Sequence, residues 1–160
     1  MSTITFPRRD GPAPSTSSWA PHLQLDQNAS AQMQALLKER VFALDTVEER
    51  QTVLSDPRAR AIWLRDEIPI GSSEVLLAGT REIGHFHPWD GSMHIALPPD
   101  MAEQAIAAGW AEMHPVARAG KAPRNVVMLF GPRTQAELDV LFELIASAIR
   151  AADGRPQQPT

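Results

Sequence analysis

A histidine-rich segment near the middle of the chain has the pattern of a β-hairpin and constrains the fold more than any other part of the sequence. Two runs of strand type, residues 82–87 and 92–97, are separated by the turn-forming sequence Pro-Trp-Asp-Gly at 88–91. Side chains alternate between the faces of a strand, so one face is apolar and the other carries imidazoles. The expected core face holds Phe86, Met93, Ile95 and Leu97, and the opposite face holds His85, His87 and His94. In the simplest register His87 lies nearly opposite His94.

Helical patterns flank the hairpin on both sides. Apolar residues three and four positions apart predict a helix over 30–44, and a weaker helical pattern covers 46–54. A further helix is expected over about 98–108. Pro98, Pro99 and Asp100 suit its start, and Gly109 ends it. Thr134 caps a last long helix with one apolar stripe, and Glu137 completes a capping box at its start.

Three other segments complete the predicted elements. Residues 58–65 fit a strand or a helix, 73–78 form a short apolar run typical of a strand, and 125–130 form a nearly continuous apolar run typical of a central strand. The order of the elements predicts a single α+β domain, whose mostly antiparallel sheet has helices packed on one face. A doubly wound parallel sheet is disfavoured, because strands and helices do not alternate regularly.

The chain divides into one domain and two flanking segments. Its 160 residues suffice for a single domain with a substantial core. Residues 1–20 are rich in Pro and Ser, and we expect a flexible, extended arm there. Residues 21–152 are expected to form the folded domain, and 153–160 a disordered tail.

The composition excludes several classes of site. The chain contains no cysteine, so disulfides, zinc–thiolate sites, iron–sulfur clusters and cysteine nucleophiles are excluded. A net charge of −4 offers no basic surface for nucleic acid. The sequence shows neither an apolar run long enough for a membrane span nor a secretory signal, so we expect a cytoplasmic protein. Glycine-rich phosphate-binding motifs are absent too, so neither a nucleotide nor a flavin is expected as cofactor.

Four of the five histidines lie within thirty residues, and the hairpin brings three of them together. Imidazole is the commonest metal ligand among side chains, so His85, His87 and His94 are predicted to bind a divalent transition metal such as iron, manganese, zinc or nickel. His114 is a candidate fourth ligand or general base. Two carboxylates are near enough in sequence to bind the metal or support its ligands: Glu82 and Glu112. The alternatives are metal-free acid–base chemistry, substrate hydrogen bonding, and histidines that only hydrogen-bond to the backbone.

Further residues are candidates for substrate binding, each with an ordinary structural alternative. Trp89 and Asp90 either border a pocket or serve only the turn. Arg133 follows a buried strand, where it either binds a substrate carboxylate or phosphate or forms an ion pair within the fold. His22 lies over the site if the Pro-rich arm folds back on it. The full predicted substrate-binding set is His22, Glu82, Trp89, Asp90, Glu112 and Arg133.

Four motifs occur in a fixed order along the chain. They are Glu-Ile-Gly-His-Phe-His-Pro at 82–88, Asp-Gly-Ser-Met-His-Ile-Ala-Leu-Pro at 90–98, Gly-Trp-Ala-Glu-Met-His-Pro at 109–115 and Val-Met-Leu-Phe-Gly-Pro-Arg at 127–133. With these motifs the sequence resembles the luciferase-domain family, which includes the fungal luciferases and many small bacterial proteins. The resemblance extends over about residues 11–151. This chain departs from the family pattern in having no tyrosine and in carrying Gly84 and Phe86 beside His85.

The resemblance implies an oxygenase-type activity. Fungal luciferases add dioxygen to a hydroxylated styrylpyrone, and the peroxide then loses carbon dioxide without a flavin or nucleotide. For this chain the resemblance implies an electron-rich enol or phenol as the substrate, with dioxygen as the second reactant. The residues that it points to first are His85, His87, His94 and His114, followed by His22, Glu82, Asp90, Glu112 and Arg133.

Three functions therefore stay open at the level of sequence. The first is a small oxygenase in which a histidine removes the enol proton and the anion reacts with dioxygen, directly or at a His-bound metal. The second is a metal-dependent hydrolase or lyase, in which a His-bound metal delivers hydroxide. The third is a non-catalytic module that binds a small molecule or a metal. A homodimer is compatible with any of the three.

Overall fold

The computed structural model describes residues 5–156 and contains one six-stranded sheet. The strands are β1 (Val47–Gln51), β2 (Arg60–Leu64), β3 (Glu82–Phe86), β4 (Met93–Ala96), β5 (Ala111–Met113) and β6 (Val126–Leu129). Their order in the sheet is β1-β2-β3-β4-β6-β5, and every neighbouring pair is antiparallel.

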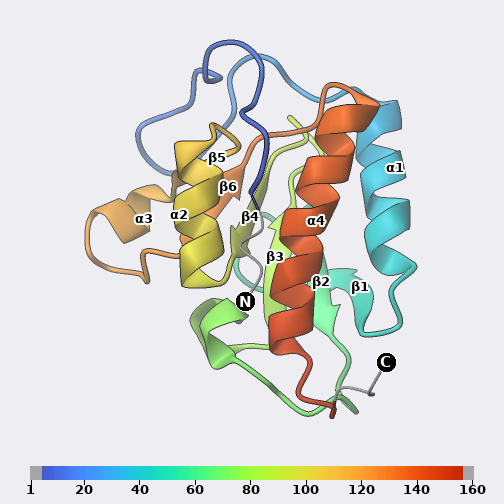
Figure 1. Cartoon of the computed structure of the whole chain (residues 1–160). Helices are drawn as coiled ribbons and strands as arrows, with labels where there is room; N and C mark the ends of the chain where they lie inside the picture. The colour runs from blue at the N-terminus through green and yellow to red at the C-terminus, as the bar shows by residue number, and fades with distance from the viewer. Residues whose placement is uncertain (1–4, 157–160) are drawn as a thin grey trace.

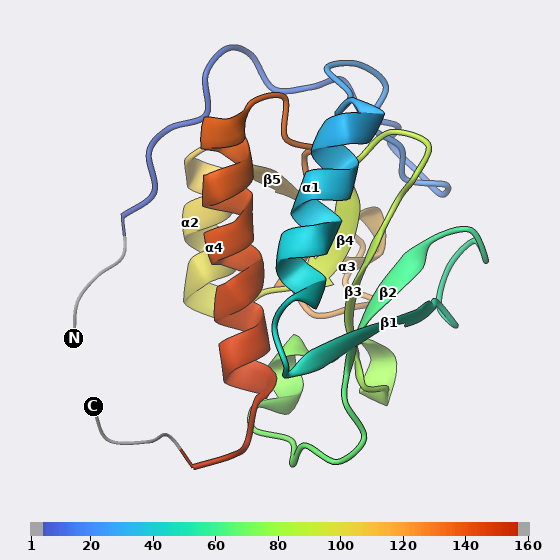
Figure 2. The ribbon, with the colours of Figure 1, turned by 90° about the vertical axis from the view of Figure 1, so that its right-hand side faces the viewer.

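The helices gather mainly on one side of this sheet. They are α1 (Ala31–Phe42), α2 (Pro99–Ala107), the short α3 (Pro115–Arg118) and α4 (Gln135–Ala152), with two 3-10 turns, η1 (Ser73–Val75) and η2 (Leu77–Gly79). Figure 1 shows α4 crossing in front of the strands with α1 and α2 on either side of it, and Figure 2 shows α1 and α4 running next to each other. The predicted single α+β domain, with an antiparallel sheet and helices on one face, is confirmed.

Helix α4 supplies the largest part of the helical layer of the core. Its buried side chains, which repeat at helical spacing and belong to the hydrophobic core, include Leu138, Leu141, Leu144, Ile145 and Ile149. Thr134 caps its start by accepting a hydrogen bond from the backbone N–H of Glu137. The Glu137 carboxylate accepts a hydrogen bond from the backbone N–H of Arg133 instead of completing the capping box at Thr134.

The predicted helix over 46–54 is wrong, because this segment forms β1 and pairs with β2. Its Glu, Arg and Gln residues favour a helix locally, but tertiary pairing overrides so weak a preference. Lys38 of α1 and Arg60 of β2 both contact the carboxylate of Glu49, so the charges of β1 are paired across elements. The ambiguous segment 58–65 is a strand, β2.

The predicted strand over 73–78 is also wrong, because the chain forms η1 and η2 there. Val75 and Leu77 are buried, which accounts for the apolar run. A short apolar run fits any buried segment, and Ala78 has a φ of 49°, which a strand cannot accommodate. The apolar run 125–130 does form a strand, β6, and it lies between β4 and β5.

The N-terminal segment runs across the top of the domain before α1 (Figure 1). The backbone N–H of Arg9 donates to the carbonyl of Ala108, and the indole of Trp110 donates to the carbonyl of Pro7 at 2.7 Å. The predicted mobility of 1–20 and 153–160 stays a prediction, and 1–4 and 157–160 lie outside the described residues. None of the helices in the described part of the chain combines the length and the apolar character that a membrane crossing needs.

Candidate active site

A cleft of about 870 Å³ opens on the face of the sheet opposite α1 and α4. All five histidines of the chain line it, and they are called the histidine cluster below: His22, His85, His87, His94 and His114. Its other walls come from residues 20–23, from 54–58 between β1 and β2, and from 116–126 around α3. These walls are mostly apolar, as is usual for a cleft that binds a small molecule.

Strand register places two of the histidines side by side. His85 on β3 pairs directly with His94 on β4, while Phe86 pairs with Met93 on the core face. The alternation expected from the sequence is therefore correct, but the expected pairing of His87 with His94 is wrong by two residues, because His85 takes that place. His87 follows the end of β3, where its backbone N–H donates to the carbonyl of Ser92, and its ring centroid lies 4.5 Å from that of His94.

A β-bulge brings Glu82 to the histidine face. Ile62 of β2 pairs with Gly84 and Trp63 pairs with Glu82, so Ile83 is an extra residue in β3. The extra residue reverses the alternation, which would otherwise have pointed Glu82 away from His85. Glu82 is fully buried, and its carboxylate lies 2.7 Å from Nδ1 of His85.

The β3–β4 turn holds His87 through a second buried carboxylate. Nδ1 of His87 lies 2.9 Å from the hydroxyl of Ser92, which donates to the carboxylate of Asp90 at 2.7 Å. Asp90 also accepts the backbone N–H groups of Ser92 and Gln24. Asp90 thus acts on the cleft through Ser92, whereas Trp89 lines it directly and stacks on the ring of His87 at 5.0 Å.

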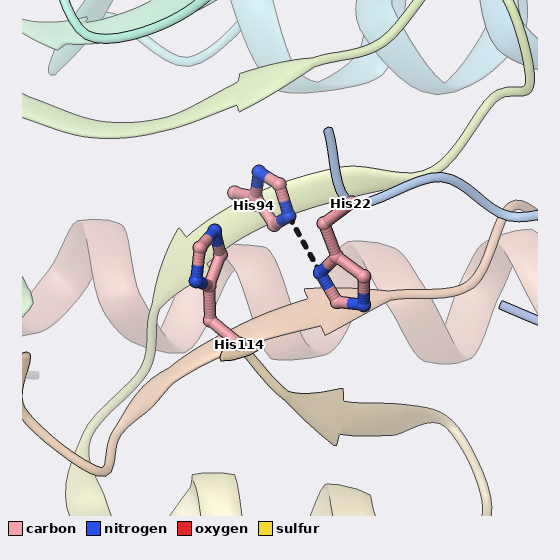
Figure 3. Close-up of side chains that lie close together, drawn as sticks. All are labelled: His22, His94 and His114. Carbon is pink, nitrogen blue, oxygen red and sulfur yellow. Dashed lines mark hydrogen bonds between the residues drawn. The ribbon is translucent and has the colours of Figure 1, made fainter. Parts of the chain in front are cut away.

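His22 joins the cluster from the N-terminal segment. Its Nδ1 lies 3.0 Å from Nε2 of His94 (Figure 3), and its Nε2 lies 2.6 Å from a carboxylate oxygen of Glu112 on β5. Nδ1 of His94 in turn lies 3.4 Å from Nε2 of His85. The groups form one continuous row across the sheet, in the order Glu82, His85, His94, His22 and Glu112.

His114 enters the cleft from the start of α3. The backbone N–H of Val116 donates to Nδ1 of His114 at 3.1 Å. Because a backbone N–H is always a donor, neutral His114 carries its hydrogen on Nε2. His114 is therefore a hydrogen-bond donor in its neutral form, which argues against the fourth-ligand and general-base roles expected from the sequence. Its ring centroid lies 4.3 Å from that of His94, and Figure 3 shows the two rings close together. Both residues line the cleft.

Burial keeps the centre of the cluster uncharged. Desolvation, reinforced by the neighbouring histidines, lowers the pKa of His87 to about 3 and that of His114 to about 4. The same two causes lower the pKa of His94 well below its usual value. At neutral pH these three imidazoles are therefore neutral, and each has one N–H and one lone pair.

Arg133 is the one predicted site residue that neither lines the cleft nor contacts the histidine cluster or its hydrogen-bond partners, whereas Glu82, Asp90 and Glu112 lie behind the lining and make such contacts. Its guanidinium forms an ion pair with Glu137 and donates to the side-chain oxygen of Gln27 and the carbonyl of Asp10. The structure also adds Ser92 and Thr52, which contacts Glu82 at 3.0 Å. The spacing Asp90-x-Ser92 in the turn was a local signal for Ser92, whereas nothing near Thr52 in the sequence marks it.

Comparison with known proteins points to one family. The family described as "Luciferase domain" matches residues 80–148, which include β3, β4, β5, β6 and most of α4. The chain is 29% identical to a luciferase of Armillaria mellea and to one of Armillaria ostoyae, and 27% identical to one of Neonothopanus nambi. Each alignment covers 90% of this chain and 60% of the fungal protein, so the chain spans less than two thirds of the length of these relatives. No solved structure matches it.

Proposed function

We propose, for a chain that belongs to the luciferase-domain family, an oxygenase-type activity on an enolic or phenolic small molecule. One observation carries the proposal: all five histidines line an apolar cleft, and two of them contact carboxylates. Apolar walls suit a flat ring, and a row of imidazoles suits the acidic hydroxyl of an enol or phenol. The fungal relatives named luciferase support an oxidative reaction over other uses of such a cleft.

Binding would place the substrate ring near Trp89 and its oxygen over the histidine cluster. Nε2–H of His114 is the natural donor to that oxygen, because its other ring nitrogen is occupied by the backbone of Val116. In the metal-free protein Nε2 of His85 is the natural proton acceptor, because the Glu82 carboxylate at its Nδ1 stabilises the imidazolium that forms. The product of this step is an enolate held between the mostly apolar walls of the cleft.

The oxidative step then uses dioxygen as the only oxidant. The enolate carbon gives two electrons to dioxygen, one carbon–oxygen bond forms, and the peroxide that results takes up the proton from His85. The net change is the addition of one dioxygen molecule to the substrate as a hydroperoxide, so no flavin or other reductant is required. The proposal thus agrees with the absence of a glycine-rich nucleotide motif in the sequence.

Oxygen uptake in the presence of hydroxypyrones and catechols tests the proposal. Glu82→Gln and His85→Gln should lower the turnover rate about 100-fold, the usual size of a lost acid–base contribution. Glu137→Gln is the matched control, because Glu137 is also a buried carboxylate but lies outside the cleft. A substrate that binds in the cleft without any oxygen consumption, or equal losses in all three variants, would refute the proposal.

A metal-dependent hydrolase or lyase activity at the same histidine cluster is the second candidate function. The observation that favours it is the close approach of ring nitrogens of His85, His87 and His94, which lie within 4.8 Å of one another. Turnover that continues without oxygen and stops after treatment with a chelator would favour this candidate over the oxygenase.

A further inference from the structure

The hydrogen bonds around the cleft floor fix which ring nitrogens of the histidines are free. Nδ1 of His85 faces the Glu82 carboxylate at 2.7 Å, so its hydrogen lies there and Nε2 keeps a lone pair. The hydroxyl of Ser92 donates to Asp90, so it accepts from Nδ1 of His87. The free lone pair of His87 is therefore also on Nε2.

The position of the hydrogen on His94 follows from its contact with His22. Nε2 of His22 donates to the carboxylate of Glu112, so Nδ1 of neutral His22 is an acceptor. That acceptor takes the hydrogen on Nε2 of His94 and leaves Nδ1 of His94 with a lone pair. This lone pair faces the lone pair on Nε2 of His85 at 3.4 Å, so no hydrogen lies between the two nitrogens.

The distances suit a shared cation. Nitrogens bound to one ion at about 2.0–2.1 Å lie roughly 3.3–3.4 Å apart in a tetrahedral arrangement and roughly 2.8–3.0 Å apart at adjacent octahedral positions. One ring nitrogen of each of the three histidines lies within 4.8 Å of the other two, and Nδ1 of His94 and Nε2 of His85, which face each other, are 3.4 Å apart. Each of the three histidines also donates its other N–H to a fixed acceptor, an arrangement typical of metal-bound histidine.

A second group, made of His22, His94 and His114, also has ring nitrogens within 4.8 Å of one another. Its members do not offer three lone pairs, however. Nδ1 of His22 and Nε2 of His94 are already joined by a hydrogen, and Nε2 of His114 carries a hydrogen because Val116 occupies Nδ1. The two groups are thus distinguished by their hydrogen bonds.

The charge around the cluster also favours a cation. The carboxylates of Glu82, Asp90 and Glu112 all contact the histidines or their immediate hydrogen-bond partner. Within residues 5–156 none of the three forms an ion pair with Lys or Arg, and their ion-pair contacts are with His85 and His22 alone. Glu82 and Asp90 are buried, whereas the side chain of Glu112 is about a quarter exposed. A buried carboxylate without a balancing cation is costly, and a divalent ion among the imidazoles would balance Glu82 and Asp90.

We propose that Nε2 of His85, Nε2 of His87 and Nδ1 of His94 bind one divalent transition-metal ion. Three imidazoles suit iron, zinc, nickel or copper, and three protein ligands leave positions open toward the cleft, as in catalytic rather than structural sites. Metal binding itself does not depend on the proposed function. The inference rests on that function only in assigning the open positions of the ion to the enolate oxygen of the substrate. With the ion bound, Nε2 of His85 no longer accepts the proton, so the substrate would enter as its anion.

Titration of the chelator-treated full-length protein with Co²⁺ tests the site, because the visible absorption of this ion reports its ligands. We expect one equivalent bound and an affinity at least 100-fold lower in His85→Gln and His87→Gln. Ser92→Ala should lower the affinity 10- to 100-fold, because it removes the hydrogen bonds that link His87 to Ser92 and Ser92 to Asp90. His114→Gln is the matched control and should change the affinity less than threefold. Circular dichroism of each variant verifies that the fold is intact.

The outcomes separate the metal site from the proposed function. A protein that binds no Co²⁺, or one in which His114→Gln weakens binding as much as His87→Gln, overturns the metal site. Oxygen uptake is measured on the same samples, with and without Fe²⁺. Oxygen uptake by a protein that binds no metal would overturn the metal site and support the oxygenase. Co²⁺ binding that responds to the variants as expected, without oxygen uptake on any bound substrate, would support the metal site and overturn the oxygenase.

Discussion

Substitution of Arg133 by Ala distinguishes a structural ion pair from a substrate-binding cation. The guanidinium is about 29% exposed and donates to the Glu137 carboxylate, with Nε at 3.1 Å and Nη2 at 2.6 Å. It also donates to Gln27 at 2.9 Å and to the carbonyl of Asp10 at 2.8 Å, so it ties the N-terminal segment to the start of α4. Its removal leaves a largely buried carboxylate without its partner.

The expected cost follows from these contacts. Hydrogen bonds to charged groups contribute about 1.5–3 kcal/mol each when buried, and partial exposure reduces that figure, so we expect Arg133→Ala to lose about 2 kcal/mol of unfolding free energy. For a chain of this length that loss lowers Tm by roughly 4–8 °C. The KM for any substrate of the cleft should stay within twofold, because Arg133 does not line the cleft.

The pH dependence gives an independent check. Burial by itself raises the pKa of the Glu137 carboxyl, but hydrogen bonds from Arg133 outweigh burial and leave the pKa below its usual value. A carboxyl with a lowered pKa stabilises the fold above about pH 4.5, and this stabilisation is lost as the pH falls. The stability difference between wild type and Arg133→Ala should therefore shrink below that pH in urea unfolding experiments.

The ion pair also couples the effects of substitutions at Arg133 and Glu137. Because most of the loss arises through Glu137, the double variant Arg133→Ala/Glu137→Gln should be about 1 kcal/mol more stable than the sum of the single losses predicts. An unchanged Tm together with a tenfold higher KM in Arg133→Ala would refute the structural reading and restore Arg133 as a substrate-binding residue.

Three further predictions concern the cleft and the core. Glu82→Gln should lower the maximal rate of oxygen uptake, measured on the pH plateau, about 100-fold with little change in KM. A change in KM alone would contradict the role of Glu82 in supporting proton transfer by His85. Trp89→Ala should raise KM roughly tenfold, since loss of a stacked ring costs about 1.4 kcal/mol, and steady-state kinetics would show whether it does. Leu141→Ala should lower the unfolding free energy by about 2–5 kcal/mol in urea titrations, because Leu141 is only 2% exposed, while the folded fraction keeps its uptake rate.

Much of the fold follows from local patterns. Helix α4 was predicted from a stripe of apolar residues and a Thr cap, and α1 from the same spacing after Ser30, which accepts the backbone N–H of Met33. Both patterns depend only on neighbours within one or two turns. The strand β1 could not be predicted in this way, because its helix-forming residues are held extended by pairing with β2.

Gly84 illustrates a requirement that the sequence could not explain. A Cβ atom at this position would lie 2.6 Å from the backbone carbonyl oxygen of His94 on the neighbouring strand. The glycine therefore permits the close approach of β3 and β4 next to the bulge at Ile83. The approach depends on two strands and on the bulge together, so inspection of one segment does not reveal it.

The sequence by itself determined that His85, His87 and His94 would share one face of a hairpin, because strand alternation is a property of neighbouring residues. The tertiary structure alone decided how those imidazoles are held. His22 reaches His94 across 72 positions of sequence, and Glu82 reaches His85 only because a bulge reverses the alternation. Contacts of this kind depend on the path of the whole chain, and here they decide which ring nitrogens of the three histidines are free to bind.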